Sequence, residues 1–141
     1  MTTGPAVVAQ LNQHFLSGDR EGAMALIDPG VRIEQPASLP HGGIHQGHDG
    51  MAAMGRAFAG HWTRRIEDPR VVGCGEIVLQ VTRQTWTSVA TGRSATVEVV
   101  ELLTVVDGRV TQIRVFPQDT AALLSTLDDP HLDDPHLDDQ R

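Results

Sequence analysis

Residues 94–116, SATVEVVELLTVVDGRVTQIRVF, are the stretch that decides the fold of this chain. Two runs rich in β-branched residues flank Asp107 and Gly108, and Asp-Gly between such runs is a strong signal for a two-residue hairpin turn. Counting back along both strands from that turn places Glu101 directly opposite Arg114. The stretch therefore predicts an antiparallel hairpin that carries a cross-strand ion pair.

A third strand, residues 76–88, precedes this hairpin and joins it through a turn that we place at Thr91 and Gly92. That turn puts Thr82 opposite Glu101. Because side chains alternate between the faces of a strand, one face of the meander mixes apolar and polar groups: Thr82, Gln84, Trp86, Val97, Val99, Glu101, Leu103, Gln112, Arg114 and Phe116. The other face is more uniformly aliphatic. A sheet with two apolar faces must be packed against other structure on both sides, and on one side this can be a second copy of the chain.

Length and charge divide the chain into two parts. At 141 residues it is long enough for one domain with its own core. The net charge of -7 is concentrated in residues 127–141, which hold six Asp and one Arg, so the body carries only about -2. We predict a folded domain at residues 1–127 and an acidic, disordered tail with an LDDPH repeat at residues 128–141.

Residue types that are absent exclude several classes of function. The chain has no Lys and no basic stripe with interleaved aromatic residues, so nucleic-acid binding is not expected. The absence of Lys excludes Schiff-base catalysis, and the absence of Tyr removes the phenol as an acid or oxyanion donor. The lone Cys74 excludes an intramolecular disulfide. No apolar run approaches the roughly 20 residues of a membrane helix, so we expect a soluble cytoplasmic protein that does not contact membranes.

The first part of the chain predicts two helices and a strand. Apolar residues recur at helical spacing over residues 5–17, and Asp19 is placed to cap a second helix at residues 20–27. His14 lies beside the buried stripe of the first helix, either as a structural histidine or as a pocket residue. A strand follows at residues 31–35, and a proline stops it.

The loop at residues 38–50, SLPHGGIHQGHDG, is rich in glycine and histidine. Its three imidazoles, His41, His45 and His48, are of the type that transition metals prefer. Their spacing matches no established zinc pattern and the glycines leave the loop too flexible to preorganise a site, so we predict no metal centre. His41 or His45 could instead act as an acid, a base or a hydrogen-bond donor near a pocket.

A third helix is predicted at residues 50–61, with Phe58 on its inner stripe and Trp62 at its end. We place a further strand at residues 64–72. The order of helix, helix, strand, loop, helix and long antiparallel meander is α+β.

This order of elements, together with four segments of the sequence, resembles the nuclear transport factor 2-like superfamily. Within it the chain is similar to the SnoaL-like branch of polyketide cyclases and ketosteroid-isomerase-like proteins. The segments are SGDREGAMALIDPGVRIEQP, LPHGGIHQGHDGM, VVDGRVTQIRVF and QDTAALLSTL, and the resemblance covers residues 5–127.

The resemblance implies a cone-shaped, curved, mostly antiparallel sheet wrapped around the N-terminal helices, an α+β barrel that encloses a mostly apolar cavity. It also implies a homodimer packed through the outer sheet face. Members of the family isomerise, cyclise, dehydrate or hydrolyse hydrophobic small molecules, generally without a metal or an organic cofactor, and many others have no known reaction.

Carried over residue by residue, the resemblance gives a mixed set of site residues. Gln35 stands where ketosteroid isomerases have the Asp that moves the proton, and Leu11 stands near their oxyanion-hole Tyr. Glu101 keeps the carboxyl of their second oxyanion group. Asp119 resembles the general acid/base of SnoaL-like cyclases, although it is also the natural N-cap of a last helix at residues 121–127.

These residues lead to the hypothesis of cofactor-free acid/base catalysis on a hydrophobic, carbonyl-bearing metabolite such as a polyketide. Asp119 would shuttle the proton, Arg114 and Gln35 would polarise an oxygen, Glu101 would hold Arg114, and His45 could assist. The residues expected to contact the substrate are Trp86, Phe116, His41, Gln84, His14, Phe58 and Trp62. Two alternatives stay open: a ligand-binding module without chemistry, and an epoxide-opening enzyme built on Glu101, Arg114 and Asp119.

Overall fold

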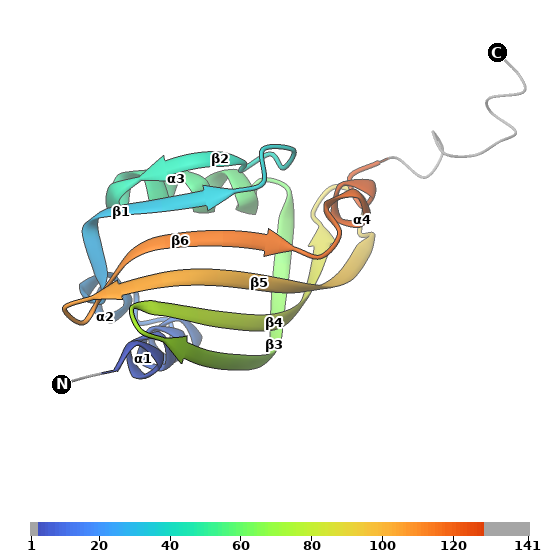
Figure 1. Cartoon of the computed structure of the whole chain (residues 1–141). Coiled ribbons are helices and arrows are strands. Elements are labelled where there is room, and N and C mark those ends of the chain that lie inside the picture. Colours follow the sequence, from blue (N-terminus) through green and yellow to red (C-terminus); the bar gives the residue numbers. More distant parts are fainter. Residues whose placement is uncertain (1–2, 129–141) are drawn as a thin grey trace, which may run out of the picture.

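The computed structural model describes residues 3–128, and the predicted disordered tail lies, apart from its first residue, outside the described residues (Figure 1). The elements are α1 (Gly4–Leu16), α2 (Arg20–Ala25), β1 (Ile27–Gln35), β2 (Gly43–Gln46), α3 (Gly47–Ala59), β3 (Trp62–Cys74), β4 (Ile77–Ser88), β5 (Ser94–Val106), β6 (Arg109–Pro117) and α4 (Thr120–Ser125). Over residues 3–128, no helix has the length and apolar character needed to cross a membrane.

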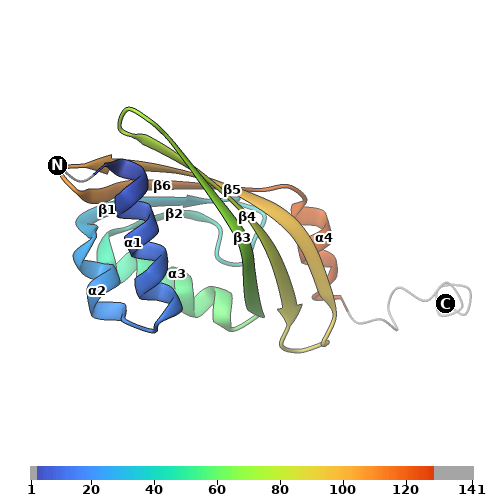
Figure 2. The same ribbon diagram turned by 90° about the horizontal axis from the view of Figure 1, so that it is seen from below.

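A single sheet of six strands, in the order β2-β1-β6-β5-β4-β3, forms the body of the protein. All neighbouring strands are antiparallel except β1 and β6, which are parallel. The sheet is curved and does not close, with α1, α2 and α3 on its concave side and α4 near its other end (Figure 2). The predicted α+β fold, a curved and mostly antiparallel sheet with N-terminal helices against it, is confirmed.

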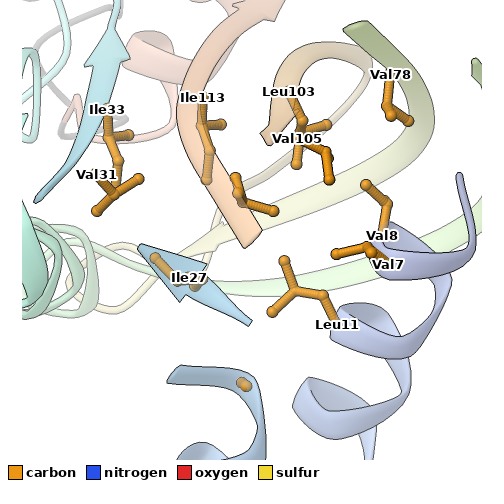
Figure 3. Packing of buried hydrophobic residues seen from close by; sticks show 12 residues of the cluster. Val7, Val8, Leu11, Ile27, Val31, Ile33, Val78, Leu103, Val105 and Ile113 are labelled. Atoms are coloured by element: carbon orange, nitrogen blue, oxygen red, sulfur yellow. The ribbon is translucent and has the colours of Figure 1, made fainter. Parts of the chain in front are cut away.

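The main hydrophobic core joins α1 to the central strands. Thr3 caps α1 by accepting a hydrogen bond from the Ala6 amide, and the helix then presents Val7, Val8 and Leu11 to the sheet (Figure 3). Their partners on the sheet are Ile27, Val31, Ile33, Val78, Leu103, Val105, Val110 and Ile113. Full burial of each aliphatic side chain contributes about 1.5–3 kcal/mol, so this contact fixes α1 on the concave face.

The hairpin of β5 and β6 forms as predicted at its turn, but its register changes further along. Val106 pairs with Arg109, and a β-bulge then shifts the strands by one residue. Glu101 therefore faces Val115, while Arg114 faces Leu102. A one-residue shift moves side chains to the opposite face. The predicted ion pair between Glu101 and Arg114 is wrong, since the two side chains point to different sides of the sheet.

The connection between β4 and β5 is longer than predicted. Thr87 pairs with Ser94, and the Ser88 amide donates to the Arg93 carbonyl at 2.8 Å, which closes a wide loop in place of a tight turn. Gln80, and not Thr82, lies opposite Glu101. Because the error is two residues, every side chain of β4 keeps the face assigned to it from the sequence.

Three segments differ from their predicted state. Residues 43–46 of the expected loop form the edge strand β2, which pairs with β1. β1 begins at Ile27, where a helix was predicted to end. β3 begins at Trp62 and runs to Cys74, with an irregularity between Glu67 and Arg70 where Asp68 adopts a positive φ of 53°.

Candidate functional site

The concave face of the sheet carries a line of polar side chains through an apolar surface. Burial alternates along β4, and the inward positions include Gln80, Thr82 and Gln84, each 6% exposed or less. The register of β5 places Glu101 beside Gln80 on the same face, and the register of β3 places Arg64 beside Trp86. Polar groups this deep in a concave surface need partners, and most of them have one.

Glu101 is the acid of this face. Burial raises the pKa of its carboxyl above the ordinary value, while the positive charge of Arg64 and a hydrogen bond from Gln80 act in the opposite direction. Asn12 on α1 donates from Nδ2 to Gln80 Oε1 at 2.6 Å. This bond leaves the Gln80 amide group free to face Glu101. The first helix thus fixes the orientation of Gln80, which is the hydrogen-bond partner of the Glu101 carboxyl.

Arg64 is the cation of this face. It is exposed as a residue, yet its guanidinium lies over the Phe58 ring, 4.8 Å from the ring centroid. Burial of the guanidinium lowers the Arg64 pKa, and the charge of Glu101 raises it. The charges of Arg64 and Glu101 therefore act on each other through space across the concave face.

An aromatic cluster lies beside Arg64. Phe58, Trp62 and Trp86 surround His41, with ring centroids 5.2, 6.0 and 5.7 Å from the imidazole. Burial, with smaller contributions from the charges of Arg64, His45 and His61, lowers the pKa of His41 to about 4. His41 is 3% exposed, and its Nδ1 is buried without a hydrogen-bond partner. The imidazole is therefore neutral at physiological pH.

Three expected substrate-binding residues use their polar atoms within the fold. Trp86 donates from Nε1 to Gln84 Oε1 at 2.8 Å, and Gln84 donates from Nε2 to Thr82 Oγ1 at 2.9 Å. Trp62 is 1% exposed and donates to Thr126 Oγ1 at 2.8 Å. The structure brings these residues together on the concave face, where they form its aromatic wall.

A second group of predicted residues lies elsewhere, in an open groove at the ends of β1 and β6. Gln35, Arg114 and Phe116 line this groove. Arg114 approaches Glu34 at 3.5 Å and stacks over Phe116, 5.2 Å from the ring centroid. Gln35 donates to the Met54 sulfur at 3.5 Å, and its Oε1 is buried without a partner. Arg114 and Phe116 face outward because of the bulge, so the structure separates them from Glu101.

Asp119 and His14 serve helix ends. Asp119 accepts a hydrogen bond from the Ala122 amide at 3.0 Å, which makes it the exposed N-cap of α4. His14 lies 3.0 Å from Asp19, the N-cap of α2, and the backbone hydrogen bond from Gly22 is the main cause that lowers the Asp19 pKa. The grouping of Glu101, Arg114 and Asp119 that an epoxide-opening enzyme would need is not formed.

The loop histidines donate to backbone carbonyls. His45 Nε2 lies 2.8 Å from the His41 carbonyl, and His48 Nε2 lies 2.9 Å from the Ile27 carbonyl. A carbonyl only accepts, so each of these nitrogens carries its proton. Within residues 3–128, no three His, Cys, Asp or Glu side chains are grouped as a metal ion requires.

Comparisons with known proteins identify the family and the fold of this chain. The family of the SnoaL-like domain matches residues 8–113, most of the described chain. The chain belongs to the SnoaL-like domain family. No functionally curated protein matches the SnoaL-like chain significantly.

Solved structures share the fold of this SnoaL-like domain. An NTF2-like protein of unknown function from Burkholderia pseudomallei is 26% identical, with a TM-score of 0.80 over 92% of this chain and 100% of the other. An NTF2-like protein from Burkholderia xenovorans is 28% identical, with a TM-score of 0.79 over 91% and 98%. A Pseudomonas putida protein assigned as a candidate polyketide cyclase is 14% identical, with a TM-score of 0.76 over 91% and 100%, a likeness of fold alone.

Sequence reasoning missed two residues of the concave face, Arg64 and Gln80, and Asn12 on α1, which donates a hydrogen bond to Gln80. The strand predicted at residues 64–72 begins at Arg64, and no face is predicted for its side chain. Extending that strand back to Trp62 gives the alternation Trp62, Arg64, Ile66, which is the signal that identifies Arg64. The predicted two-residue turn before β5 is two residues too short, so it pairs Thr82 with Glu101, whereas the structure pairs Gln80 with Glu101.

Proposed function

We propose that the concave face of this SnoaL-like domain binds a hydrophobic, carbonyl-bearing small molecule and that Glu101 transfers its proton. The observation that carries the proposal is the placement of the Glu101 carboxyl on the concave face beside Gln80, where burial raises its pKa while a hydrogen bond from Gln80 and the charge of Arg64 favour its ionised form. An acid–base group works best when its pKa lies near the operating pH, and desolvation moves a carboxyl in that direction.

The surrounding residues support an acid/base cycle without a cofactor. As a carboxylate, Glu101 can take a proton from the carbon next to the substrate carbonyl, and as the resulting acid it can return that proton to another carbon or to oxygen. Gln80 holds the carboxyl through a hydrogen bond, and Arg64 stabilises its ionised form. The cycle restores Glu101 and leaves the substrate isomerised, or activated for ring closure or loss of water.

We favour Glu101 over Asp119 as the group that transfers the proton. Its carboxylate is exposed and already accepts the Ala122 amide hydrogen, so it serves the helix directly. Glu101 has the burial and the neighbours that the reaction needs.

Proton exchange tests the proposal without knowledge of the natural substrate. We would incubate the protein with cyclic and aromatic ketones in D2O and follow loss of the hydrogens next to the carbonyl by 1H NMR. We expect the wild type to accelerate exchange of at least one ketone, and Glu101→Gln to slow that exchange by about 10²–10⁴-fold, the usual contribution of a positioned acid–base group.

The matched control is Glu98→Gln, the same chemical change on the same strand, because Glu98 lies on the outer face and pairs with Arg70 at 3.1 Å. Its exchange rate should equal that of the wild type. Asp119→Asn tests the prediction made from the sequence. A large loss in Asp119→Asn with little loss in Glu101→Gln would return the proton transfer to Asp119.

A ligand-binding module is the second candidate function, and one observation favours it. The polar atoms of Trp86, Gln84 and Thr82 satisfy one another, so part of the polar line exists without a substrate. Exchange equal to the uncatalysed rate with every ketone, together with a small molecule released on denaturation in native mass spectrometry, would support this function over catalysis.

The proposal includes a homodimer formed through the outer sheet face. Exposed apolar side chains on that face support it: Val72, Ile77, Leu79 and Phe116 are each 36% exposed or more. Apolar side chains gathered on one face mark interaction surfaces. Analytical ultracentrifugation should give a dimer that Leu79→Arg dissociates, and a wild-type monomer at micromolar concentration would contradict the assignment.

A further inference from the structure

Arg64 differs from the paired arginines of the outer face. Those arginines have carboxylate partners close by: Arg65 with Glu67 at 2.6 Å, Arg70 with Glu98 at 3.1 Å, and Arg32 with Glu34 at 3.3 Å. Within residues 3–128, Arg64 forms neither an ion pair nor a hydrogen bond, and its guanidinium contacts the Phe58 ring. It is also the one arginine that the strand registers place on the concave face of the described sheet.

The stacking on Phe58 leaves the useful part of Arg64 free. A guanidinium is planar, and its N–H bonds lie in that plane, so a ring against its face does not consume them. Two parallel N–H groups at the edge match the two oxygens of a carboxylate. The geometry therefore presents an open two-donor fork beside an aromatic surface.

The electrostatic surroundings also favour an incoming anion. Protein atoms around the guanidinium disfavour its charge, which lowers the Arg64 pKa. Glu101 is the acid whose charge acts on Arg64, and no carboxylate lies within ion-pair distance of the guanidinium among residues 3–128. His41, the other titratable group coupled to Arg64 in the aromatic cluster, is neutral above a pKa of about 4.

Apolar surface adjoins the fork. Ile66 follows Arg64 on the same face of β3 and is 47% exposed, although this face packs inward elsewhere along the sheet. Phe58 is partly buried and stands 4.9 Å from Trp86, centroid to centroid. A cation flanked by exposed apolar side chains is suited to a ligand with one charged end and a flat apolar body.

We propose that Arg64 binds a carboxylate of the substrate, so that the substrate class is a planar, apolar carboxylic acid that also carries the reacting carbonyl. The inference rests on the proposed function in placing the substrate on the concave face. The carboxylate lies in the fork of Arg64, the apolar body lies along Phe58 and Ile66, and the carbonyl end reaches Glu101.

Two unreactive probes of equal shape test this inference. Isothermal titration calorimetry at pH 7.5 would compare 2-naphthoate with the neutral 2-naphthamide. We expect wild type to bind 2-naphthoate at least 10-fold more tightly. Arg64→Gln should remove that preference and leave the affinity for 2-naphthamide unchanged, and Arg64→Lys should keep part of it because the charge remains without the fork. Arg65→Gln, on the outer face of the same strand, is the matched control and should keep the full preference.

Equal affinity of the wild type for the two probes would overturn the inference, as would no binding of either probe or an unchanged preference in Arg64→Gln. Loss of both affinities in Arg64→Gln would also overturn it, because a specific anchor affects only the acid. The result is independent of the exchange assay. A preference that depends on Arg64, without any ketone exchange, would retain the anchor and reject the acid/base function.

Discussion

The buried imidazole of His41 should make the stability of the domain fall in mild acid. In the folded state burial lowers the His41 pKa from 6.5 to about 4, whereas the unfolded chain binds its proton at the ordinary value of 6.5. Between these two values the unfolded state binds more protons, so lowering the pH favours unfolding. The stabilisation that neutral His41 provides is complete above pH 6.5 and is lost as the pH falls toward 4.

The size of this effect follows from the two pKa values. Relative to pH 8, the free energy of unfolding should fall by about 2 kcal/mol at pH 5 and by about 3 kcal/mol at pH 4 through His41 alone. His41→Gln removes the titrating ring and should therefore remove this part of the pH dependence. Other titrating groups act in both proteins and cancel in the difference between them.

Urea unfolding at a series of pH values, followed by tryptophan fluorescence, measures the difference. Both tryptophans lie in the cluster around His41, so their signal reports its unfolding. His14→Gln, which changes an imidazole on α1 that faces Asp19, controls for the loss of any one histidine. Parallel loss of stability in wild type and His41→Gln between pH 7 and pH 4 would refute the reasoning from burial.

Three further predictions concern other positions. Thr126→Val removes the acceptor of the buried Trp62 N–H at nearly constant volume, and urea unfolding should show a loss of about 1–3 kcal/mol. Glu101→Gln should gain stability relative to wild type as the pH rises from 4.5 to the raised folded-state pKa of Glu101, by at most about 1.4 kcal/mol per pH unit, and the difference should then stay constant, because ionised Glu101 costs stability. Gly55→Ala, in open space within α3, should raise the melting temperature through about 0.5–1 kcal/mol of helix propensity, whereas the added Cβ of Gly42→Ala meets the backbone carbonyl of Pro36 and should lower it.

The turn between β5 and β6 could be predicted because it depends on two adjacent residues. The bulge beyond the turn was not predicted. Asp107-Gly108 sets the turn by itself, so the first pairs of β5 and β6 follow from the sequence. The bulge beyond it lets Val110, Ile113 and Val115 all face the core, although the first two are three positions apart. That odd spacing breaks the period of two and was the available sign of a bulge.

The candidate site was predicted in part for similar reasons. Trp86, Glu101 and Gln84 were assigned to the concave face correctly, because alternation depends only on local geometry. Arg114 was assigned wrongly, since one bulge reverses every later position on its strand. Arg64 was missed because its surroundings on the concave face come from β4, β5 and α3, which are distant in sequence.

The interruption in β3 bears on whether the protein aggregates in concentrated solution. β3 is a 13-residue strand at the open edge of the sheet, and such an edge is a template on which another chain can add a strand and begin aggregation. Asp68 breaks its pleat with a positive φ, and the neighbouring Pro69 offers no amide hydrogen to an incoming strand. The irregularity divides the edge into two shorter pieces, residues 62–67 and 70–74, and so shortens the continuous template that another strand could pair with.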